Sequence, residues 1–249
     1  MTTEVCLTVD VEDWYDGMAV LGEPFERPRG AASGLAGLAT LLASAGPGAT
    51  ATLFVVGGYV PTVRTELVEL GALGHEIASH GPDHGRLPEA PDVLLEWLRR
   101  GRDLVEQELQ RRVRGFRSPR FDIPPSIGLA GFRDLLAEAG FDYVSDTACL
   151  GEASPIRELP VLTMHRVPVG GGSYQRMLPG AVVSSLVRAA SRPAVLYYHS
   201  YDFGATLPST GSIRSAAVAK QLVGRGRIAG VFERLLRQYG SKGCAHVEW

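Results

Sequence analysis

Residues 5–13 read Val-Cys-Leu-Thr-Val-Asp-Val-Glu-Asp, a run of apolar and β-branched residues that ends in three acidic side chains. Short runs of this kind are typical of strands in a parallel sheet, where both faces of the strand are buried. We therefore expect a first strand over residues 5–11. Its acids, Asp10, Glu12 and Asp13, would lie where the strand ends, which is the edge at which α/β folds place their active sites.

The rest of the chain alternates short strand-like runs with longer helical patterns, as βα units do. One α/β domain of barrel type, covering residues 1–249, is the expected architecture. Further strands are expected over 52–56, 76–79, 115–117, 143–145 and 195–199, with an edge strand between Pro160 and Pro168 and a last short strand in 244–249. Helices are expected over 35–44, 61–73, 91–112, 127–139, 179–190 and 214–239, the last interrupted near 224–226.

The composition excludes several classes of protein. The chain has 249 residues, of which 45% are hydrophobic and 21% charged, and its formal net charge is −2. This apolar content argues against a disordered chain, and the nearly neutral charge argues against a nucleic-acid partner. No apolar run reaches the roughly 18 residues that a transmembrane helix needs, and the first residues do not resemble a signal peptide. A cytoplasmic protein is therefore expected.

Polar residues also follow the other expected strands. His80 and His84 come after the third strand, Arg117 lies on the fourth, Asp146 follows the fifth, and His199 ends the strand over 195–199. Because parallel strands end at the same edge of a sheet, these side chains are expected to converge with the acids of the first strand. This convergence predicts an active site at that edge.

The stretch His80-Gly-Pro-Asp-His84 places two imidazoles four residues apart. If the chain turns helical after Pro82, both side chains point the same way, as a facial pair of metal ligands requires. Two histidines and one carboxylate, with the other positions left to water, form a common catalytic metal shell. The sequence therefore predicts a metal site at His80 and His84.

The acids of the first strand would then have two functions. One would complete the metal shell, and another, held near the metal but not bound to it, would act as a general base. Alternation along the strand puts Asp10 and Glu12 on one face, which favours Glu12 as the ligand. A turn immediately after Val11 would bring Asp13 to the metal instead, so both assignments stay open.

These motifs, in this order over about residues 4–203, resemble the polysaccharide deacetylase family, which is also called the NodB homology domain or carbohydrate esterase family 4. Residues 8–13 resemble its T-F-D-D motif, 79–84 its H-S/T-x-x-H motif, 116–119 its R-x-P motif, Asp146 the acid of its fourth motif, and 197–199 its L-x-H motif. The spelling Asp-Val-Glu-Asp-Trp over 10–14 is similar to a subgroup that acts on bacterial polysaccharide or glycan intermediates.

The resemblance implies a distorted (β/α) barrel of about seven strands and metal-dependent hydrolysis of an acetyl group on a sugar. Asp10 would be the base that activates the hydrolytic water, and Arg117 would hold it in place. His80 and His84 would bind the divalent metal, most simply Zn²⁺, although the same ligands accept Co²⁺ or Ni²⁺.

The resemblance also implies that His199 protonates the leaving amine, with its pKa and orientation tuned by Asp146. The backbone N–H of Arg120 would help to stabilise the tetrahedral oxyanion. Arg120 stands where the family usually has an aromatic residue, so its side chain would contact an anionic substrate group or be solvated. Tyr197 stands where the family prefers leucine, which would reshape the pocket for the acetyl methyl group.

The expected substrate is a small molecule or glycan that carries an N-acetyl amino sugar. Two rival functions remain. A deformylase or cyclic-amide hydrolase would use the same acid, base and metal, and would release a different product. A carbohydrate-binding relative without activity would bind sugar but hold no metal, and the altered first motif leaves room for it.

Overall fold

The computed structural model describes residues 4–14, 16, 34–44, 48–165, 167–190, 193–204 and 222–247. Within these residues, seven parallel strands form one curled sheet in the order β6-β5-β4-β3-β2-β1-β7. The strands are β1 (Val5–Val11), β2 (Thr52–Val55), β3 (Glu76–Ser79), β4 (Gly115–Phe116), β5 (Tyr143–Val144), β6 (Arg157–Glu158) and β7 (Ala194–His199). The predicted distorted (β/α) barrel of about seven strands is thus confirmed.

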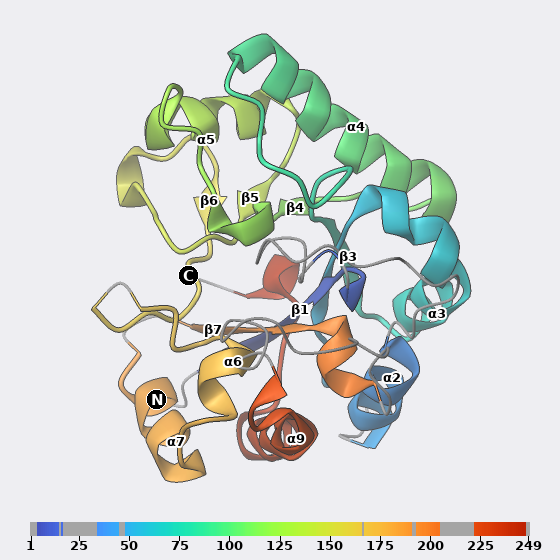
Figure 1. The fold of residues 1–249 in the computed structure, drawn as a ribbon, viewed down its shortest axis with the longest axis vertical. Helices are drawn as coiled ribbons and strands as arrows, with labels where there is room; N and C mark the ends of the chain where they lie inside the picture. Colours follow the sequence, from blue (N-terminus) through green and yellow to red (C-terminus); the bar gives the residue numbers. More distant parts are fainter. Residues whose placement is uncertain are drawn as a thin grey trace.

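Helices cover the outside of the curled sheet (Figure 1). They are α2 (Leu35–Ser44), α3 (Val60–Ala72), α4 (Pro91–Leu109), α5 (Gly128–Glu138), α6 (Gly172–Gln175), α7 (Gly180–Arg188) and α9 (Ile228–Tyr239). Proline lies in the first turn of α3 and of α4, where its missing N–H would have no partner within the helix. None of the helices in the described ranges is both long and apolar enough to cross a membrane.

Side-chain alternation along β1 separates the two sides of the sheet. Val5, Leu7 and Val9 belong to the large core between the sheet and its helices, whereas Cys6 belongs to a smaller core inside the curl. Successive strand residues point to opposite faces. Asp10 therefore shares the inner face with Cys6, and its carboxylate is directed into the barrel rather than toward the helices.

The segment after β6 joins the two edges of the curled sheet. The Val161 N–H donates to Asp146 O at 2.9 Å, and the next N–H, from Leu162, donates to Val195 O of β7 at 2.9 Å. The edge strand predicted between Pro160 and Pro168 is therefore wrong in its position, because the edge strand is β6, which ends before Pro160. Proline cannot donate to a strand ladder, so the ladder of β6 stops before Pro160 and only isolated bridges follow it.

The last predicted strand, in 244–249, is wrong over the described residues. Cys244–His246 form one 3₁₀ turn at the amino end of the sheet. Its backbone N–H groups donate to side chains rather than to another strand: Cys244 N–H to Thr52 Oγ1 at 2.7 Å and Ala245 N–H to Glu76 Oε2 at 2.9 Å. This C-terminal turn closes the end of the barrel opposite the predicted site.

Within the described residues, the long helix predicted over 214–239 corresponds to α9. A 3₁₀ turn over Arg225–Arg227 leads into α9, which agrees with the expected interruption near 224–226. Gly224 before it adopts φ 69°, a left-handed conformation that suits glycine. Residues 214–221 lie outside the described residues.

Candidate metal centre and active site

The predicted site residues lie at the carboxyl edge of the sheet. In the register of β1 with β7, Asp10 is opposite His199. Ser79 at the end of β3 is opposite Phe116 at the end of β4, so the residues that follow them, His80 and Arg117, leave the sheet side by side. The parallel topology thus brings four strand ends together, as predicted.

Glu12, His80 and His84 form the group that could hold a metal ion. Their ligand atoms all lie within 4.8 Å of one another. Among the described residues, no other set of three histidine, cysteine or carboxylate side chains is clustered in this way. Glu12 is 1% exposed and His80 is 3% exposed. Asp13 is not part of the group. Of the two assignments that the sequence left open, the geometry favours Glu12, which stays on the same side of the chain as Asp10.

The loop between the two histidines is not helical, whereas the prediction that the two side chains point the same way depended on a helical turn after Pro82. Residues 82–85 form bends, and Gly81 before them adopts φ 81°. A Cβ at Gly81 would lie 2.2 Å from the Trp97 ring, so only glycine fits this turn. The rings of His80 and His84 nevertheless converge, with their centroids 5.4 Å apart.

Hydrogen bonding prepares the first histidine to bind a cation. His80 Nδ1 lies 2.9 Å from the carbonyl oxygen of Arg117. A carbonyl can only accept a hydrogen bond, so Nδ1 carries the proton and Nε2 keeps its lone pair. Burial lowers the pKa of His80, which favours the neutral form that metals require.

The carboxylate of Glu12 completes the group. Glu12 Oε2 lies 2.6 Å from His84 Nε2, yet it makes no well-aligned hydrogen bond to any part of the chain that the structure describes. Burial opposes ionisation of Glu12, but the neighbouring imidazoles, His84 above all, bring its pKa down to about 2. A buried, ionised carboxylate with one oxygen that makes no good hydrogen bond fits a metal ligand, and the donor set of two imidazoles and one carboxylate fits a divalent cation.

Asp10 and Arg117 form a buried ion pair beside this group. Arg117 Nη1 lies 2.7 Å from Asp10 Oδ1, and the exposed fractions are 0% and 4%. The guanidinium also donates to Thr8 Oγ1, Ser145 O and Ser145 Oγ at 2.8–2.9 Å, and it lies 4.2 Å from the centre of the Phe54 ring. These contacts hold the Arg117 side chain in a single conformation, and Arg117 in turn fixes the position of the Asp10 carboxylate.

His199 faces Glu12 from the end of β7. Its Nε2 lies 3.7 Å from Glu12 Oε1, and Tyr201 stacks on it with ring centroids 4.9 Å apart. Burial lowers the pKa of the imidazole, but the carboxylates of Asp202 and Glu12 outweigh burial and raise it to about 9. His199 is thus disposed to carry a proton.

The partner of His199 is Asp202 and not the predicted Asp146. Asp202 Oδ2 accepts the His199 N–H at 3.1 Å and lies 3.6 Å from His199 Nδ1. The two residues cap the 3₁₀ turn Ser200–Phe203 reciprocally. The predicted pairing of Asp146 with His199 is therefore corrected, because the carboxylate of Asp146 binds Ser118 and Arg133 instead.

Asp146 accepts hydrogen bonds from the residue that follows Arg117. Its Oδ1 accepts the Ser118 N–H at 2.9 Å, and its Oδ2 accepts the Ser118 hydroxyl at 3.0 Å. Arg133, which is completely buried on α5, lies 3.2 Å from the same carboxylate and 2.7 Å from Glu158 on β6. Asp146 therefore belongs to a network beneath the turn that follows Arg117.

That turn contains Arg120 and Phe121, two consecutive residues with positive φ, at 63° and 54°. Each left-handed non-glycine residue stores on the order of 1–3 kcal/mol of strain. Arg120 is exposed, whereas Phe121 packs edge-on against Tyr197 with ring centroids 5.0 Å apart. Tyr197 in turn contacts His199, with ring centroids 5.9 Å apart, so the turn reaches the active-site edge.

Sequence reasoning missed Asp202. The signal that could have found it is the spacing His199-Ser-Tyr-Asp202 directly after a strand, since an acid three residues beyond a helix start commonly bonds back to it. Thr8 and Ser145, which hold Arg117, were also missed, because a hydroxyl on a strand carries no signal until its neighbour is known.

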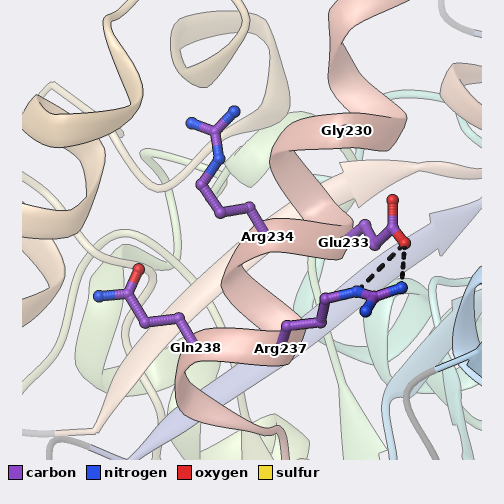
Figure 2. A pocket seen from close by; sticks show the side chains of 5 residues that line it. All are labelled: Gly230, Glu233, Arg234, Arg237 and Gln238. Atoms are coloured by element: carbon purple, nitrogen blue, oxygen red, sulfur yellow. Dashed lines mark hydrogen bonds and ion pairs between the residues drawn. The ribbon is translucent and has the colours of Figure 1, made fainter.

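A surface pocket lies away from the strand ends and contains none of the predicted site residues. It lies on α9 and is lined by Gly230, Glu233, Arg234, Arg237 and Gln238 (Figure 2). Arg237 pairs with Glu233 at 2.8 Å within the same helix, and both side chains are exposed to solvent.

Family models match the chain in two overlapping parts. Residues 39–144 match the model described as polysaccharide deacetylase, and residues 132–247 match a domain of unknown function (DUF3473). The first motif, in residues 8–13, lies outside both matches. No curated protein matches the chain.

Solved structures share the fold at low sequence identity. A putative polysaccharide deacetylase from Mycobacterium smegmatis is 21% identical, with a TM-score of 0.62 over 96% of this chain and 87% of its own. A family 4 acetyl xylan esterase from Clostridium thermocellum, solved with a cobalt ion, is 13% identical, with a TM-score of 0.54 over 97% and 88%.

A third structure is a family 4 pseudoenzyme from Bacillus anthracis. It is 12% identical, with a TM-score of 0.55 over 97% of this chain, which spans only 63% of that protein. These identities support the fold alone. The matched family model agrees, over residues 39–144, with the resemblance to polysaccharide deacetylases that the motifs predicted.

Proposed function

We propose that the chain is a metal-dependent deacetylase that hydrolyses the N-acetyl group of an amino sugar or glycoconjugate. The observation that carries this proposal is the buried group of Glu12, His80 and His84 beside an arginine-held Asp10. Hydrolysis of an amide needs a base for water, an acid for the leaving amine and stabilisation of the oxyanion. The carboxyl edge of the sheet holds a candidate for each.

Glu12, His80 and His84 would hold the metal, and Zn²⁺ is proposed, with Co²⁺ or Ni²⁺ as alternatives. When bound, a divalent metal makes water more acidic and polarises the carbonyl of the substrate. Asp13 is not needed for this shell. The metal-ligand role of Glu12 is supported by its burial and by its poor hydrogen bonding.

Asp10 is proposed as the general base. The guanidinium of Arg117 binds one oxygen of the Asp10 carboxylate and fixes its orientation, and the other oxygen would accept a proton from water. Because Arg117 is itself held by Thr8 of β1 and by Ser145 just after β5, the base does not have to be oriented when the substrate binds.

His199 is proposed as the general acid that donates a proton to the leaving amine. Its raised pKa means that it is protonated at neutral pH, and Asp202 fixes the position of the residue. Arg120 would contribute its backbone N–H to the oxyanion, and Tyr197 would line the pocket for the acetyl group. These two roles are supported by the contact of the Arg120 turn with Tyr197 and of Tyr197 with His199.

The test is release of acetate from a panel of N-acetylated hexosamine compounds. We expect release that is abolished by EDTA and by His80→Ala, while Glu76→Gln at the opposite edge of the sheet keeps activity. Activity that survives both EDTA and His80→Ala would refute the metal mechanism. Release of formate instead of acetate, from formylated analogues, would favour a deformylase.

A binding protein without activity is the second candidate, because one structural neighbour is described as a pseudoenzyme. Protein that binds sugar, takes up no metal and releases no acetate would favour it. The cytoplasmic location and the subgroup marked by residues 10–14 stay predictions.

A further inference from the structure

We propose that Asp146 and Arg133 are positioning residues that hold the turn Ser118–Phe121 in its left-handed conformation. Through this turn they place the Arg120 N–H and the Phe121 ring at the active-site edge. The kinetic part of the proposal rests on the proposed deacetylase function. Its structural part does not.

The turn cannot hold this conformation by itself. Arg120 and Phe121 both have positive φ, and neither is glycine. The internal bonds of the turn are two short-range ones, from Phe121 N–H to Ser118 O at 3.1 Å and from Asp122 N–H to Pro119 O at 3.2 Å. Strained backbone of this kind persists only where surrounding groups determine it, and it is concentrated at functional sites.

Asp146 fixes the start of the turn. Its two oxygens accept the N–H and the hydroxyl of the same residue, Ser118, and both residues are at least 98% buried. Two hydrogen bonds to one residue set both its backbone direction and its side-chain rotamer. The direction in which the chain leaves Arg117 is thereby determined.

Arg133 holds the carboxylate of Asp146 in place. A buried carboxylate is costly unless it is paired and hydrogen-bonded. Arg133 approaches Asp146 at 3.2 Å, donates to Glu158 at 2.7 Å and to Ala148 O at 2.7 Å, and is 0% exposed. It is therefore anchored independently of Asp146, on a helix and on a neighbouring strand.

Tyr197 holds the end of the turn. Its ring meets the Phe121 ring at an interplanar angle of 82°, and the Arg117 guanidinium lies 5.8–5.9 Å from both ring centres. The turn is thus held at Ser118 by Asp146 and at Phe121 by Tyr197. With Asp146 engaged in this way, its contribution to catalysis would come through the turn and not through His199.

The experiment compares Asp146→Asn with Glu76→Gln. Glu76 is a comparable control, since it also accepts one backbone N–H together with hydroxyls, here those of Thr52 and Tyr143, but at the opposite edge of the sheet. We expect Asp146→Asn to lower kcat by about tenfold to a hundredfold with little change in KM, as misplacement of an oxyanion donor would. Glu76→Gln should leave both constants unchanged.

A milder substitution and a rescue experiment distinguish a loss of positioning from simple misfolding of the variant. Ser118→Ala deletes one hydrogen bond and no charge, and it should lower kcat severalfold. In the Asp146→Asn background, Arg120→Gly should restore part of kcat relative to Arg120→Ala, because glycine adopts a φ of 63° without strain. A purely structural role for Asp146 predicts no difference between glycine and alanine.

The overturning outcomes are distinct. Unchanged kcat in Asp146→Asn would overturn the proposal, and so would a pH profile displaced in the same way as in Asp202→Asn, since that would place Asp146 with His199. If the wild type releases no acetate, the proposed function fails. A crystal structure of Asp146→Asn then decides alone: loss of positive φ at 120–121 supports the proposal, and an unchanged turn contradicts it.

Discussion

Glu76 and Glu12, which lie at opposite edges of the sheet, differ in how their carboxylates are hydrogen-bonded. At the amino edge, Glu76 accepts hydrogen bonds from Thr52, Tyr143 and the Ala245 N–H, at 2.7–2.9 Å. At the carboxyl edge, Glu12 is more deeply buried, and its Oε2 makes no well-aligned hydrogen bond to a described residue. Burying a polar atom without a partner destabilises a fold. The difference indicates that the amino edge is built for stability and the carboxyl edge for a ligand.

The largest effect is expected from the metal group. His80→Ala and Glu12→Gln should each lower kcat by more than about 10³-fold and abolish stoichiometric metal uptake, since each removes one of three ligands. Elemental analysis of the purified variants, alongside Asp13→Asn, checks the assignment. Asp13→Asn should keep its metal, and the reverse pattern would move the ligand from Glu12 to Asp13.

The proposed base is expected to rank next. Asp10→Asn keeps the shape of the side chain but removes the charge that pairs with Arg117. We expect kcat to fall by about 10²–10⁴-fold, the usual contribution of a general base. Steady-state kinetics at full metal loading measures this, and wild-type kcat in the variant would exclude Asp10 as the base.

The pH dependence tests the partner of His199. A general acid must be protonated, so activity should be lost as pH rises through the pKa of His199, which is raised to about 9. Asp202→Asn removes one cause of that raised pKa, so the alkaline limb of kcat should move to lower pH, with a loss of about tenfold in kcat. A bound cation near Glu12 also lowers this pKa, so profiles are compared at equal metal content. If the alkaline limb of kcat did not move in Asp202→Asn, Asp202 would not be the group that raises the pKa of His199.

The smallest effect on activity is expected at the amino edge. Glu76→Gln should lower the free energy of unfolding by about 1–3 kcal/mol, because it disturbs acceptors for the C-terminal turn. Denaturant unfolding monitors the loss, and acetate release should not change. If Glu76→Gln abolished activity without loss of stability, the contrast between the two edges would be wrong.

Strand ends were predictable because local patterns encode them. The buried run 5–11 and the strand over 76–79 were predicted with the observed bounds, and parallel pairing then brings Asp10, His80 and His199 to one edge. What could not be predicted depended on long-range partners. The C-terminal residues read as a strand, but their N–H groups bond to Thr52 and Glu76, which the sequence places far away.

The site shows the same division. Residue types and spacing identified His80 and His84 as candidate ligands, although the loop between them is not helical. The resemblance assigned Asp146 to His199, whereas in the structure Asp146 contacts Ser118 and Arg133, and Asp202 lies beside His199. Pattern can rank acids as functional, but which acid reaches which base is decided by packing.

The central claim is that a metal held by Glu12, His80 and His84 makes this edge of the sheet hydrolytic. Its most direct test is acetate release from N-acetylated hexosamines by protein stripped with a chelator and then reloaded with Zn²⁺, Co²⁺ or Ni²⁺. We expect no release from the stripped protein and recovery on reloading with at least one of these metals. Equal release from stripped and reloaded protein would contradict it.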